Sequence, residues 1–523
     1  MYSWNNSDVG DSKFFKYSNF LVFGAGAGAA LIIAVILNTF FADLFIENPI
    51  IITILYVPAF VIGFFVKTYV IREVGTVEWG KYATAHTFAI IADTFLSISI
   101  PFIILKFFPD FINRSKDVAS QLIRKIFIYA FSISSIFLVS MIFLSPILDK
   151  YFYVKTDDFS YLLLVISIHV PISIFMGVIA SLYRSVLKIK EIIIYGTFVS
   201  VPVRAILTFI VFQYTNNIMY FVAIEIFTQI LTLFLLYYFF NKNEFRIFNI
   251  KKDPNFFIKN EVISYGKNMY ANSLVSLLST QSLSFILGVM LTPDKMGIYS
   301  ILLSISALSM FLDKNLRQVF APAVSKLFAE NRLSELNSLY KNTTFIVNLF
   351  TVPFAILVCF FSDEILKLFA SDSSLSVYKN YLFALIIGNM ICLLSGNSKT
   401  FMIMAGMEKK ELSIQLIRGV LSFALALVLI REYELVAVVT LFIIFTIYVG
   451  AAQLISIKKE INISPFSKEL LFLVIISLPI IWFSITQNYS FQFYHFIIVP
   501  IGLYLLYFSI FYKRIFNLYK ELK

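Results

Sequence analysis

The chain has 523 residues, of which 59% are hydrophobic and only 14% are charged, and its formal net charge is +11. Soluble domains carry about 25% charged residues, so this composition excludes an ordinary soluble protein and indicates a membrane protein. The positive charge does not indicate nucleic-acid binding, because Lys and Arg recur in alternate loops instead of gathering in one domain. The sequence has no P-loop, zinc motif or nucleophile motif, so it predicts no cofactor, no metal site and no catalytic residue.

Apolar runs long enough to cross a bilayer follow one another along the chain, separated by short polar breaks. Because lipid offers the backbone no hydrogen-bond partners, each span must be a helix, and the expected fold is an all-α integral membrane protein. An apolar run at 17–41 predicts an extra N-terminal hydrophobic helix, and whether it crosses the membrane stays open. About fourteen further spans are expected, at 49–71, 82–106, 123–148, 160–183, 191–213, 218–240, 262–291, 297–321, 342–368, 379–405, 411–430, 433–456, 466–486 and 490–512.

Lys and Arg are concentrated in every second loop between these spans. The basic segments are 106–125, 184–190, 241–259, 326–341, 409–410, 458–459 and the tail at 513–514. Since cytoplasmic loops carry the excess of Lys and Arg, these segments and the C-terminus are predicted to be cytoplasmic. We therefore expect a multi-pass protein of the cell (plasma or inner) membrane.

Two short patterns recur at almost the same distance. LTPDKMGIY at 291–299 repeats features of VGTVEWGKY at 74–82, with Gly297 lying 217 residues after Gly80, and both are expected to be outward-facing turns. EKKE at 408–411 likewise follows KIKE at 188–191 by 220 residues. Repetition of this kind predicts two halves of parallel topology with a substrate path between them. The expected domains are an N-terminal segment with the extra helix (1–48), a six-helix bundle (49–240), a cytoplasmic linker (241–261), a second six-helix bundle (262–456), and two C-terminal helices with a basic tail (457–523).

Several segments together resemble the polysaccharide transporters of the multidrug/oligosaccharidyl-lipid/polysaccharide (MOP) exporter superfamily, the lipid-linked oligosaccharide flippases. They read REVGTVEWGKYA, SLYRSVLKIKEIIIYGTFVSVPVR, ISYGKNMYANSLVSLLSTQSLSFILGVMLTPDKMGIYS, APAVSKLFAENRLSELNSLYKN and SGNSKTFMIMAGMEKKELS. The resemblance implies a MOP-type fold, with two six-helix bundles around a central cavity and two C-terminal helices. The extra N-terminal helix departs from that plan. Leu283 and Ser284 stand where the family often has an Asp-Arg pair, so the role of that pair is not transferred.

The resemblance also implies a function. We expect a flippase that moves a polyprenyl (di)phosphate-linked oligosaccharide from the cytoplasmic to the outer leaflet, for surface polysaccharide assembly or protein glycosylation. Its partners would be the lipid-linked glycan, membrane lipids and H⁺ or Na⁺, and it would act as a monomer. The alternative is an ion-coupled multidrug or small-molecule exporter of the same fold. An enzyme is disfavoured because the predicted outer loops are short.

Charges inside predicted spans are the candidate site residues, because a charge at the bilayer centre costs at least a few kcal/mol. Five cations could line a cavity and bind the phosphate groups: Arg204, Lys314, Arg317, Lys399 and Arg418. Other interpretations stay open. Arg204 could belong to a buried structural pair, Asp313 and Arg317 are spaced for a pair within one helix, and Lys399 and Arg418 lie near span ends where they could snorkel.

Four other side chains inside predicted spans are candidates for ion coupling: Asp93, His169, Glu225 and Asp313. Buried carboxylates can carry protons, and an imidazole can titrate near neutral pH. The alternative for Asp93 and Glu225 is that they neutralise Arg204 or another cation. The alternative for His169 is a packing role.

Overall fold

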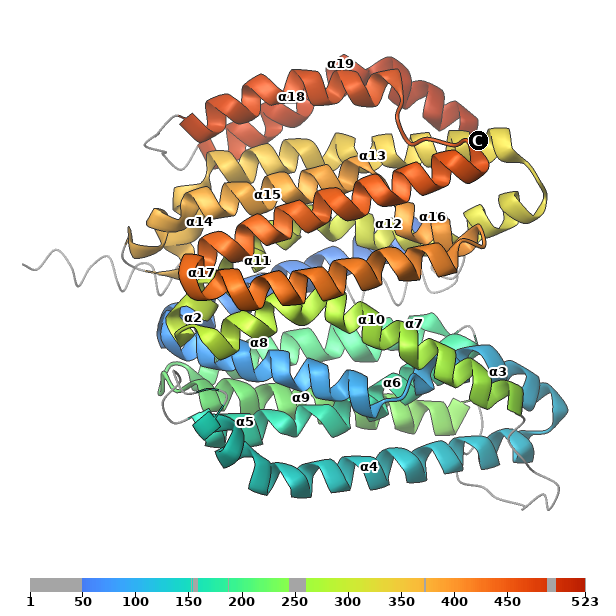
Figure 1. Cartoon of the computed structure of the whole chain (residues 1–523), viewed down its shortest axis with the longest axis vertical. Coiled ribbons are helices and arrows are strands. Elements are labelled where there is room, and N and C mark those ends of the chain that lie inside the picture. Colours follow the sequence, from blue (N-terminus) through green and yellow to red (C-terminus); the bar gives the residue numbers. More distant parts are fainter. Residues whose placement is uncertain are drawn as a thin grey trace, which may run out of the picture. The chain divides into compact units, whose positions relative to one another are not determined.

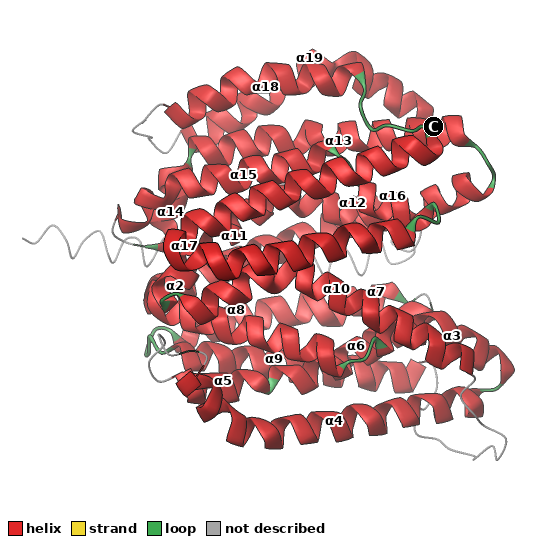
Figure 2. Ribbon diagram, viewed as in Figure 1, coloured by secondary structure: helices red, strands yellow, loops and turns green. Residues whose placement is uncertain are grey.

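The computed structural model describes residues 49–151, 153, 159–186, 188–243, 260–370, 373–486 and 495–522. Every regular element within these ranges is a helix, and Figures 1 and 2 show no strand among them. The all-α fold expected from composition is therefore confirmed. The predicted extra helix at 17–41 and most of the predicted linker at 241–261 lie outside the described residues.

Contacts between residues divide the chain into two compact units. The first unit holds the described residues up to Gly75 together with Ala85–Ser273, and the second holds Thr76–Thr84 and the chain from Leu274 onward. The division thus passes through two helices instead of falling in a loop. The predicted domain boundaries follow the sequence repeat and not these contacts, and they remain a prediction.

The first unit is built around an apolar core at one end of its helices. Its elements are α2 (Pro49–Leu96, apart from Thr76–Thr84), α3 (Ile100–Arg114), α4 (Lys116–Tyr151), α5 (Phe159–Ser167), α6 (His169–Ser185), α7 (Ile189–Ile193), the π-helical turn η1 (Ile194–Val199), α8 (Ser200–Val211), α9 (Ile218–Asn243) and the beginning of α10 (Asn260–Met290). Buried aliphatic and aromatic side chains of α3, α4, α6 and α9 form the core. The Tyr183 hydroxyl also donates to the Leu236 carbonyl at 2.9 Å, which joins α6 to α9.

The second unit contains the remaining helices. They are the rest of α10, α11 (Pro293–Ala307), η2 (Leu308–Met310), α12 (Phe311–Ala329), α13 (Leu333–Phe360), α14 (Ser362–Phe369), η3 (Ser373–Tyr378), α15 (Lys379–Leu394), α16 (Ser398–Met404), α17 (Glu408–Ile461), α18 (Lys468–Thr486) and α19 (His495–Leu522). The last two lie alongside α13, as Figure 1 shows. An apolar cluster that includes Phe345, Leu473 and Tyr507 holds the three helices together.

Two long helices are each two spans joined at a sharp kink. In α2 the kink is at Gly75, whose φ of 83° is a conformation that glycine adopts easily and other residues rarely do. In α17 it is at Glu434, where φ is 47°. The predicted spans 411–430 and 433–456 are therefore confirmed as the two arms of α17. The predicted span 82–106 is interrupted: the chain leaves the helix at Ser97–Ser99, and α3 continues at an angle of 42°.

The two repeated motifs are mostly helical, which corrects their prediction as turns. In VGTVEWGKY only Gly75 leaves the helix, and Thr76–Thr84 is regular. In LTPDKMGIY the helix α11 begins at Pro293, a residue whose fixed φ and missing N–H suit the first helical position. Glycine and proline in these motifs mark a single-residue kink and a helix start.

The equivalent glycines of the two motifs pack directly against each other within the second unit. A Cβ atom on Gly80 would collide with the Pro293 carbonyl, and one on Gly297 would collide with the Thr76 carbonyl. The close crossing is reinforced by two side-chain hydrogen bonds. Thr76 Oγ1 donates to Asp294 Oδ1 at 2.5 Å, and Trp79 Nε1 donates to Ser300 Oγ at 2.7 Å. Only glycine at both positions allows the backbones this close.

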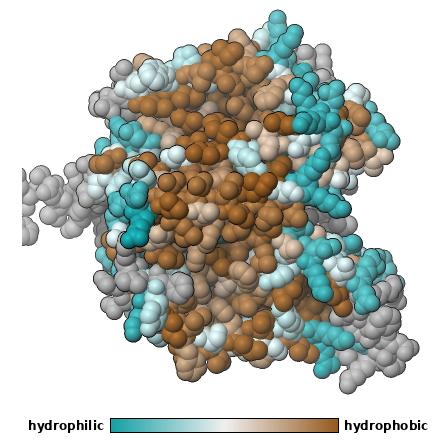
Figure 3. All heavy atoms as spheres, in the orientation of Figure 1, coloured by the Kyte–Doolittle hydropathy of each residue, from teal (hydrophilic) through white to brown (hydrophobic). Residues whose placement is uncertain are grey.

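The helices present a hydrophobic band suited to lipid. Nine described helices are long and apolar enough to cross a membrane, or ten if the bent pair of α2 and α3 is one span. Figure 3 shows hydrophobic side chains over the middle of the helices on this face and hydrophilic ones near their ends. Large apolar side chains such as Phe143, 71% exposed, and Trp482, 72% exposed, would be unfavourable in water. The chain is a multi-pass membrane protein.

Basic helix ends gather at one end of the second unit. The cluster that joins α12, α13 and α16 to Ile457 and Ile463 brings together the connections that carry the predicted basic segments 326–341, 409–410 and 458–459. Lys410 and Glu460 form an ion pair there. At the kink of α17, far along both arms from these segments, Lys295 Nζ lies 2.6 Å from Glu434 Oε2 in another ion pair. This arrangement is the one expected if the basic segments share one side of the membrane.

Candidate functional site: two polar clusters inside the helical units

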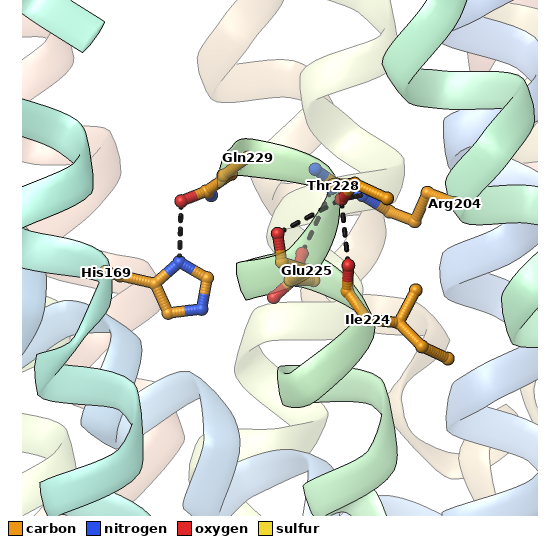
Figure 4. A network of polar contacts seen from close by, with 6 residues as sticks. All are labelled: His169, Arg204, Ile224, Glu225, Thr228 and Gln229. Carbon is orange, nitrogen blue, oxygen red and sulfur yellow. Dashed lines mark hydrogen bonds and ion pairs between the residues drawn. The ribbon is translucent and has the colours of Figure 1, made fainter. Parts of the chain in front are cut away.

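Arg204 of α8 and Glu225 of α9 form an ion pair inside the first unit. Arg204 Nη1 lies 3.1 Å from Glu225 Oε1, as Figure 4 shows. Arg204 Nε also donates to Thr228 Oγ1 at 3.4 Å. The Thr228 hydroxyl uses its own hydrogen for the Ile224 carbonyl at 2.9 Å and the Glu225 carbonyl at 3.0 Å, so its oxygen is free to accept. The predicted alternative, in which Glu225 neutralises Arg204, is confirmed.

His169 of α6 has one partner for its two ring nitrogens. Its Nδ1 lies 2.9 Å from Oε1 of Gln229, as Figure 4 shows, and with Gln229 as the acceptor Nδ1 carries the hydrogen. Within the described ranges, its buried Nε2 has no hydrogen-bond partner. His169 is therefore not a fully satisfied packing residue.

Asp93 of α2 lies half-buried against α6. The hydroxyl of Ser173, one turn after His169, lies within hydrogen-bonding reach of its carboxyl. The carboxyl oxygen Oδ1 is buried and has no partner in the described part of the chain. Among the residues that the structure describes, Asp93 forms no ion pair with Arg204, and it keeps an unused acceptor inside the first unit.

Two ionisable side chains of this cluster were missed from the sequence. Lys67 and His86, both on α2, lie within electrostatic range of Glu225, and His86 also lies within range of Arg204 and His169. Both fall inside predicted spans, where any ionisable side chain is a functional candidate. Their position inside apolar runs is the signal in the sequence that points to them.

In the second unit, Asp313 and Arg317 of α12 form the predicted intrahelical pair, with Arg317 Nη2 2.7 Å from Asp313 Oδ2. Arg317 Nε also donates to Asn397 Oδ1 at 3.0 Å. Asp313 is buried, but 42% of the Arg317 side chain remains exposed. The ion pair leaves part of the Arg317 guanidinium accessible, so this group can also bind a second anion. The Lys314 side chain lies outside the described residues.

Lys399 of α16 and Arg418 of α17 are half-buried and share the electrostatic environment of Arg317. The charges of Arg317 and Arg418 both act on Lys399. Neither Lys399 nor Arg418 has a hydrogen-bond or ion-pair partner among the residues that the structure describes. Three cations from three helices thus lie in one region, and two of them keep their donors free.

A second carboxylate near these cations, Glu411, was also missed from the sequence. Glu411, expected in a charged turn, is only 3% exposed and belongs to the first arm of α17. Its Oε1 accepts from Gln415 Nε2 and its Oε2 from Gln453 Nε2, each at 2.8 Å. The glutamine carbonyls accept in turn from Ser279 at 2.7 Å and Ser398 at 2.5 Å. The negative charge of Glu411 acts on both Lys399 and Arg418.

Comparison with known proteins gives a family and a fold. Residues 70–378, more than half of the chain, match the family described as "Polysaccharide biosynthesis protein". No curated protein matches the chain. An inward-facing multidrug resistance MATE family transporter of the MOP superfamily has a similar structure, with a TM-score of 0.60 and 13% identity, covering 80% of this chain and 94% of that one.

Two further MATE structures agree with this fold. MATE in the bent conformation gives a TM-score of 0.52 at 14% identity and covers 84% of this chain and 98% of its own. MATE in complex with MaL6 gives 0.50 at 15% identity, with 77% and 96% covered. These identities are low enough that they show the fold alone, and the expected MOP-type fold is confirmed. With the family match over more than half of its length, the chain belongs to the family described as "Polysaccharide biosynthesis protein", and it has the fold of the MOP-superfamily transporters.

Proposed function

We propose that this protein is a flippase that moves a polyprenyl (di)phosphate-linked oligosaccharide from the cytoplasmic to the outer leaflet by alternating access. The observation that carries the proposal is the group of Arg317, Lys399 and Arg418 in the second unit. Two carboxylates, Asp313 and Glu411, offset these three cations only in part. A diphosphate headgroup supplies the missing negative charge.

The chemistry of these side chains suits a diphosphate. A guanidinium donates two parallel hydrogen bonds to phosphate oxygens, whereas an ammonium acts as a point charge. Lys399 and Arg418 have no internal partner in the described residues, so binding would not require them to give one up. In a half-buried site the attraction is stronger than in water. Lys314, on the same helix as Arg317, stays a predicted member of this group.

The first unit would serve ion coupling more than phosphate binding. Arg204 is already paired with Glu225, so it offers less net charge to a substrate. Asp93 Oδ1 and His169 Nε2 are buried polar atoms without partners in the described part of the chain. We propose that Asp93, His169 and Glu225 take up and release the coupling ion, H⁺ or Na⁺. Asp313, whose carboxylate is committed to Arg317, is the weaker candidate.

The membrane side and the oligomeric state are also part of the proposal. The basic helix ends gathered in the second unit support a cytoplasmic location for them and for the C-terminus, in the cell membrane. The protein is proposed to act as a monomer. A multidrug exporter of the same fold would carry cationic or neutral substrates, which three clustered cations disfavour.

Binding of a soluble headgroup probe tests this proposal. Farnesyl diphosphate should bind the purified full-length protein in detergent, measured by calorimetry, and ethidium should not. Arg317→Gln and Arg418→Gln should each weaken farnesyl diphosphate binding by about tenfold or more, the loss expected for one charge-assisted contact. Arg418→Lys should bind farnesyl diphosphate with an affinity between those of wild type and Arg418→Gln, because lysine keeps the charge but loses the bidentate geometry.

The matched control is Arg431→Gln. Arg431 lies on the same arm of α17 as Arg418 but is exposed beside the kink. Its loss should leave farnesyl diphosphate binding unchanged. If Arg431→Gln weakens binding as much as Arg418→Gln does, the effect is one of net charge, and a specific anion site is excluded. Binding of ethidium but not of farnesyl diphosphate would favour the multidrug exporter.

A further inference from the structure

Glu411 is held in one orientation by four polar side chains from three helices. The two glutamine amides that donate to its oxygens are themselves oriented by serine hydroxyls, since each glutamine carbonyl accepts from a serine. A carboxylate that accepts on both oxygens and donates on neither is satisfied in its ionised form. The network therefore holds a negative charge at a fixed place in the second unit.

Glu411 lies near two cations without pairing with them directly. Arg418 follows it by two turns on the same arm of α17. Lys399 is next to Ser398, whose hydroxyl donates to the Gln453 amide that binds Glu411. The negative charge of Glu411 acts on both cations.

Among the described residues neither cation forms an ion pair with Glu411, whereas Arg317 pairs directly with Asp313. The two glutamine amides orient the carboxylate, and in the structure it acts on the cations through its charge and not through a hydrogen bond. It lowers the repulsion between the two without using their hydrogen-bond donors.

We infer that Glu411 sets the strength with which the Lys399 and Arg418 site binds the anionic headgroup, as a fixed internal charge that favours release. The inference rests on the proposed function, since it concerns the same anion site. Glu411 stabilises the two cations while the site is empty and repels a phosphate once it is bound. A transport site must bind strongly enough to load and weakly enough to unload.

A purely structural role makes a different prediction. If Glu411 only ties α10, α16 and the two arms of α17 together, its loss would lower stability and leave anion affinity unchanged or reduced. If it competes with the headgroup, its loss would raise affinity. The sign of the change in affinity therefore separates the two roles, whatever happens to stability.

Calorimetry with farnesyl diphosphate on the purified full-length protein tests the inference. Glu411→Gln should bind about tenfold more tightly than wild type, the effect of one unit charge roughly 10 Å away at an effective dielectric of 20. Gln453→Leu is the matched control, because it removes one hydrogen bond of the network and keeps the charge. It should lower the Tm without tightening binding. Raising the salt concentration should reduce the difference in farnesyl diphosphate affinity between Glu411→Gln and wild type, because salt screens the interaction between charges.

A second variant keeps the test decisive if Glu411→Gln does not fold. Gln415→Lys keeps a donor beside Glu411 and places a positive charge against its carboxylate, so it should tighten binding by a similar factor. If wild type binds farnesyl diphosphate but neither variant shifts the affinity in the stated direction, the inference about Glu411 is wrong. The proposed function is then unaffected. A wild-type protein that binds no farnesyl diphosphate contradicts the proposed function, and the inference falls with it.

Discussion

Arg204 and Glu225 have unequal access to water, and this predicts unequal costs of removing each. The Glu225 side chain is 9% exposed and the Arg204 side chain 27%. Arg204→Gln would strand a buried carboxylate and should cost about 3 kcal/mol of stability. Glu225→Gln should cost less, because the longer Arg204 side chain can move toward water. Thermal unfolding in detergent measures both effects.

The double variant Arg204→Gln/Glu225→Gln provides the control for this pair. With both charges of the pair gone, neither of these two side chains is left without its partner, so the double variant should lose less stability than the two single variants together. Strict additivity would show that the two side chains do not interact. Equal losses for the two single variants would contradict the difference in exposure.

Glu364, on the short helix α14 between the spans α13 and α15, gives a pH-dependent prediction. Burial raises the pKa of its carboxyl above the ordinary value of 4.5, and its Oε2 has no partner in the described residues. A raised pKa in the folded state means that stability falls as the pH rises through this range and stays lower at neutral pH. Glu364→Gln should therefore raise the Tm at pH 7.5, and the gain should shrink toward pH 4.5.

The neighbouring Asp363 provides the control for this prediction. Asp363 lies 3.5 Å from Lys379 in an ion pair, so Asp363→Asn should not raise the Tm at any pH. If Glu364→Gln gains as much stability at acid pH as at neutral pH, its effect does not come from the ionised carboxylate.

At the scale of helices, the crossing of the second part of α2 over α11 is the most constrained contact. Gly80→Ala and Gly297→Ala should each destabilise the protein by about 2–3 kcal/mol, because an added Cβ would overlap a backbone carbonyl that cannot rotate away. Gly63→Ala is the matched control on α2, since nothing lies within 4 Å of the atom it adds. Alanine there should be neutral or stabilising by up to about 1 kcal/mol.

Thermal unfolding of the three glycine variants decides this prediction. A Gly80→Ala protein as stable as the Gly63→Ala protein would show that α2 and α11 do not approach this closely. If Gly63→Ala is destabilised as well, a neighbouring atom contacts position 63, and the variant no longer serves as a control.

The sequence repeat predicted these glycines as equivalent positions, but not their contact. Gly80 and Gly297 were matched because each precedes a tyrosine by two residues in similar motifs. Polar and small residues between apolar runs usually mark turns, so both motifs were predicted as turns. The helix instead continues, because Thr76 and Trp79 place their polar groups on Asp294 and Ser300 of α11. Such partners lie more than 200 residues away and cannot be read from local pattern.

The site was predictable where partners lie on one helix, and less so where they do not. The Asp313–Arg317 pair followed from a spacing of four residues. Glu411 did not, because one of the amides that satisfies it belongs to Gln453, on the other arm of α17. Local composition placed it in a charged turn. Burial of a carboxylate by distant amides is a tertiary property.

At the scale of the whole molecule, the membrane side of the helix ends can be measured. Asn216 lies exposed in the connection between α8 and α9, and Lys409 lies exposed at the start of α17. Asn216→Cys should react with an impermeant thiol reagent in intact cells, and Lys409→Cys should react only after permeabilisation. The reverse pattern would overturn the orientation and with it the proposed direction of transport.

Translocation of the lipid itself is the most direct test of the central claim. Proteoliposomes holding the full-length protein and a polyprenyl diphosphate oligosaccharide with a fluorescent label would be treated with an impermeant quencher. Wild type and Arg431→Gln should expose label from the inner leaflet much faster than empty liposomes, while Arg418→Gln should not. Equal quenching in wild-type and protein-free liposomes, or unimpaired translocation by Arg418→Gln, would contradict a flippase that works through this cationic site.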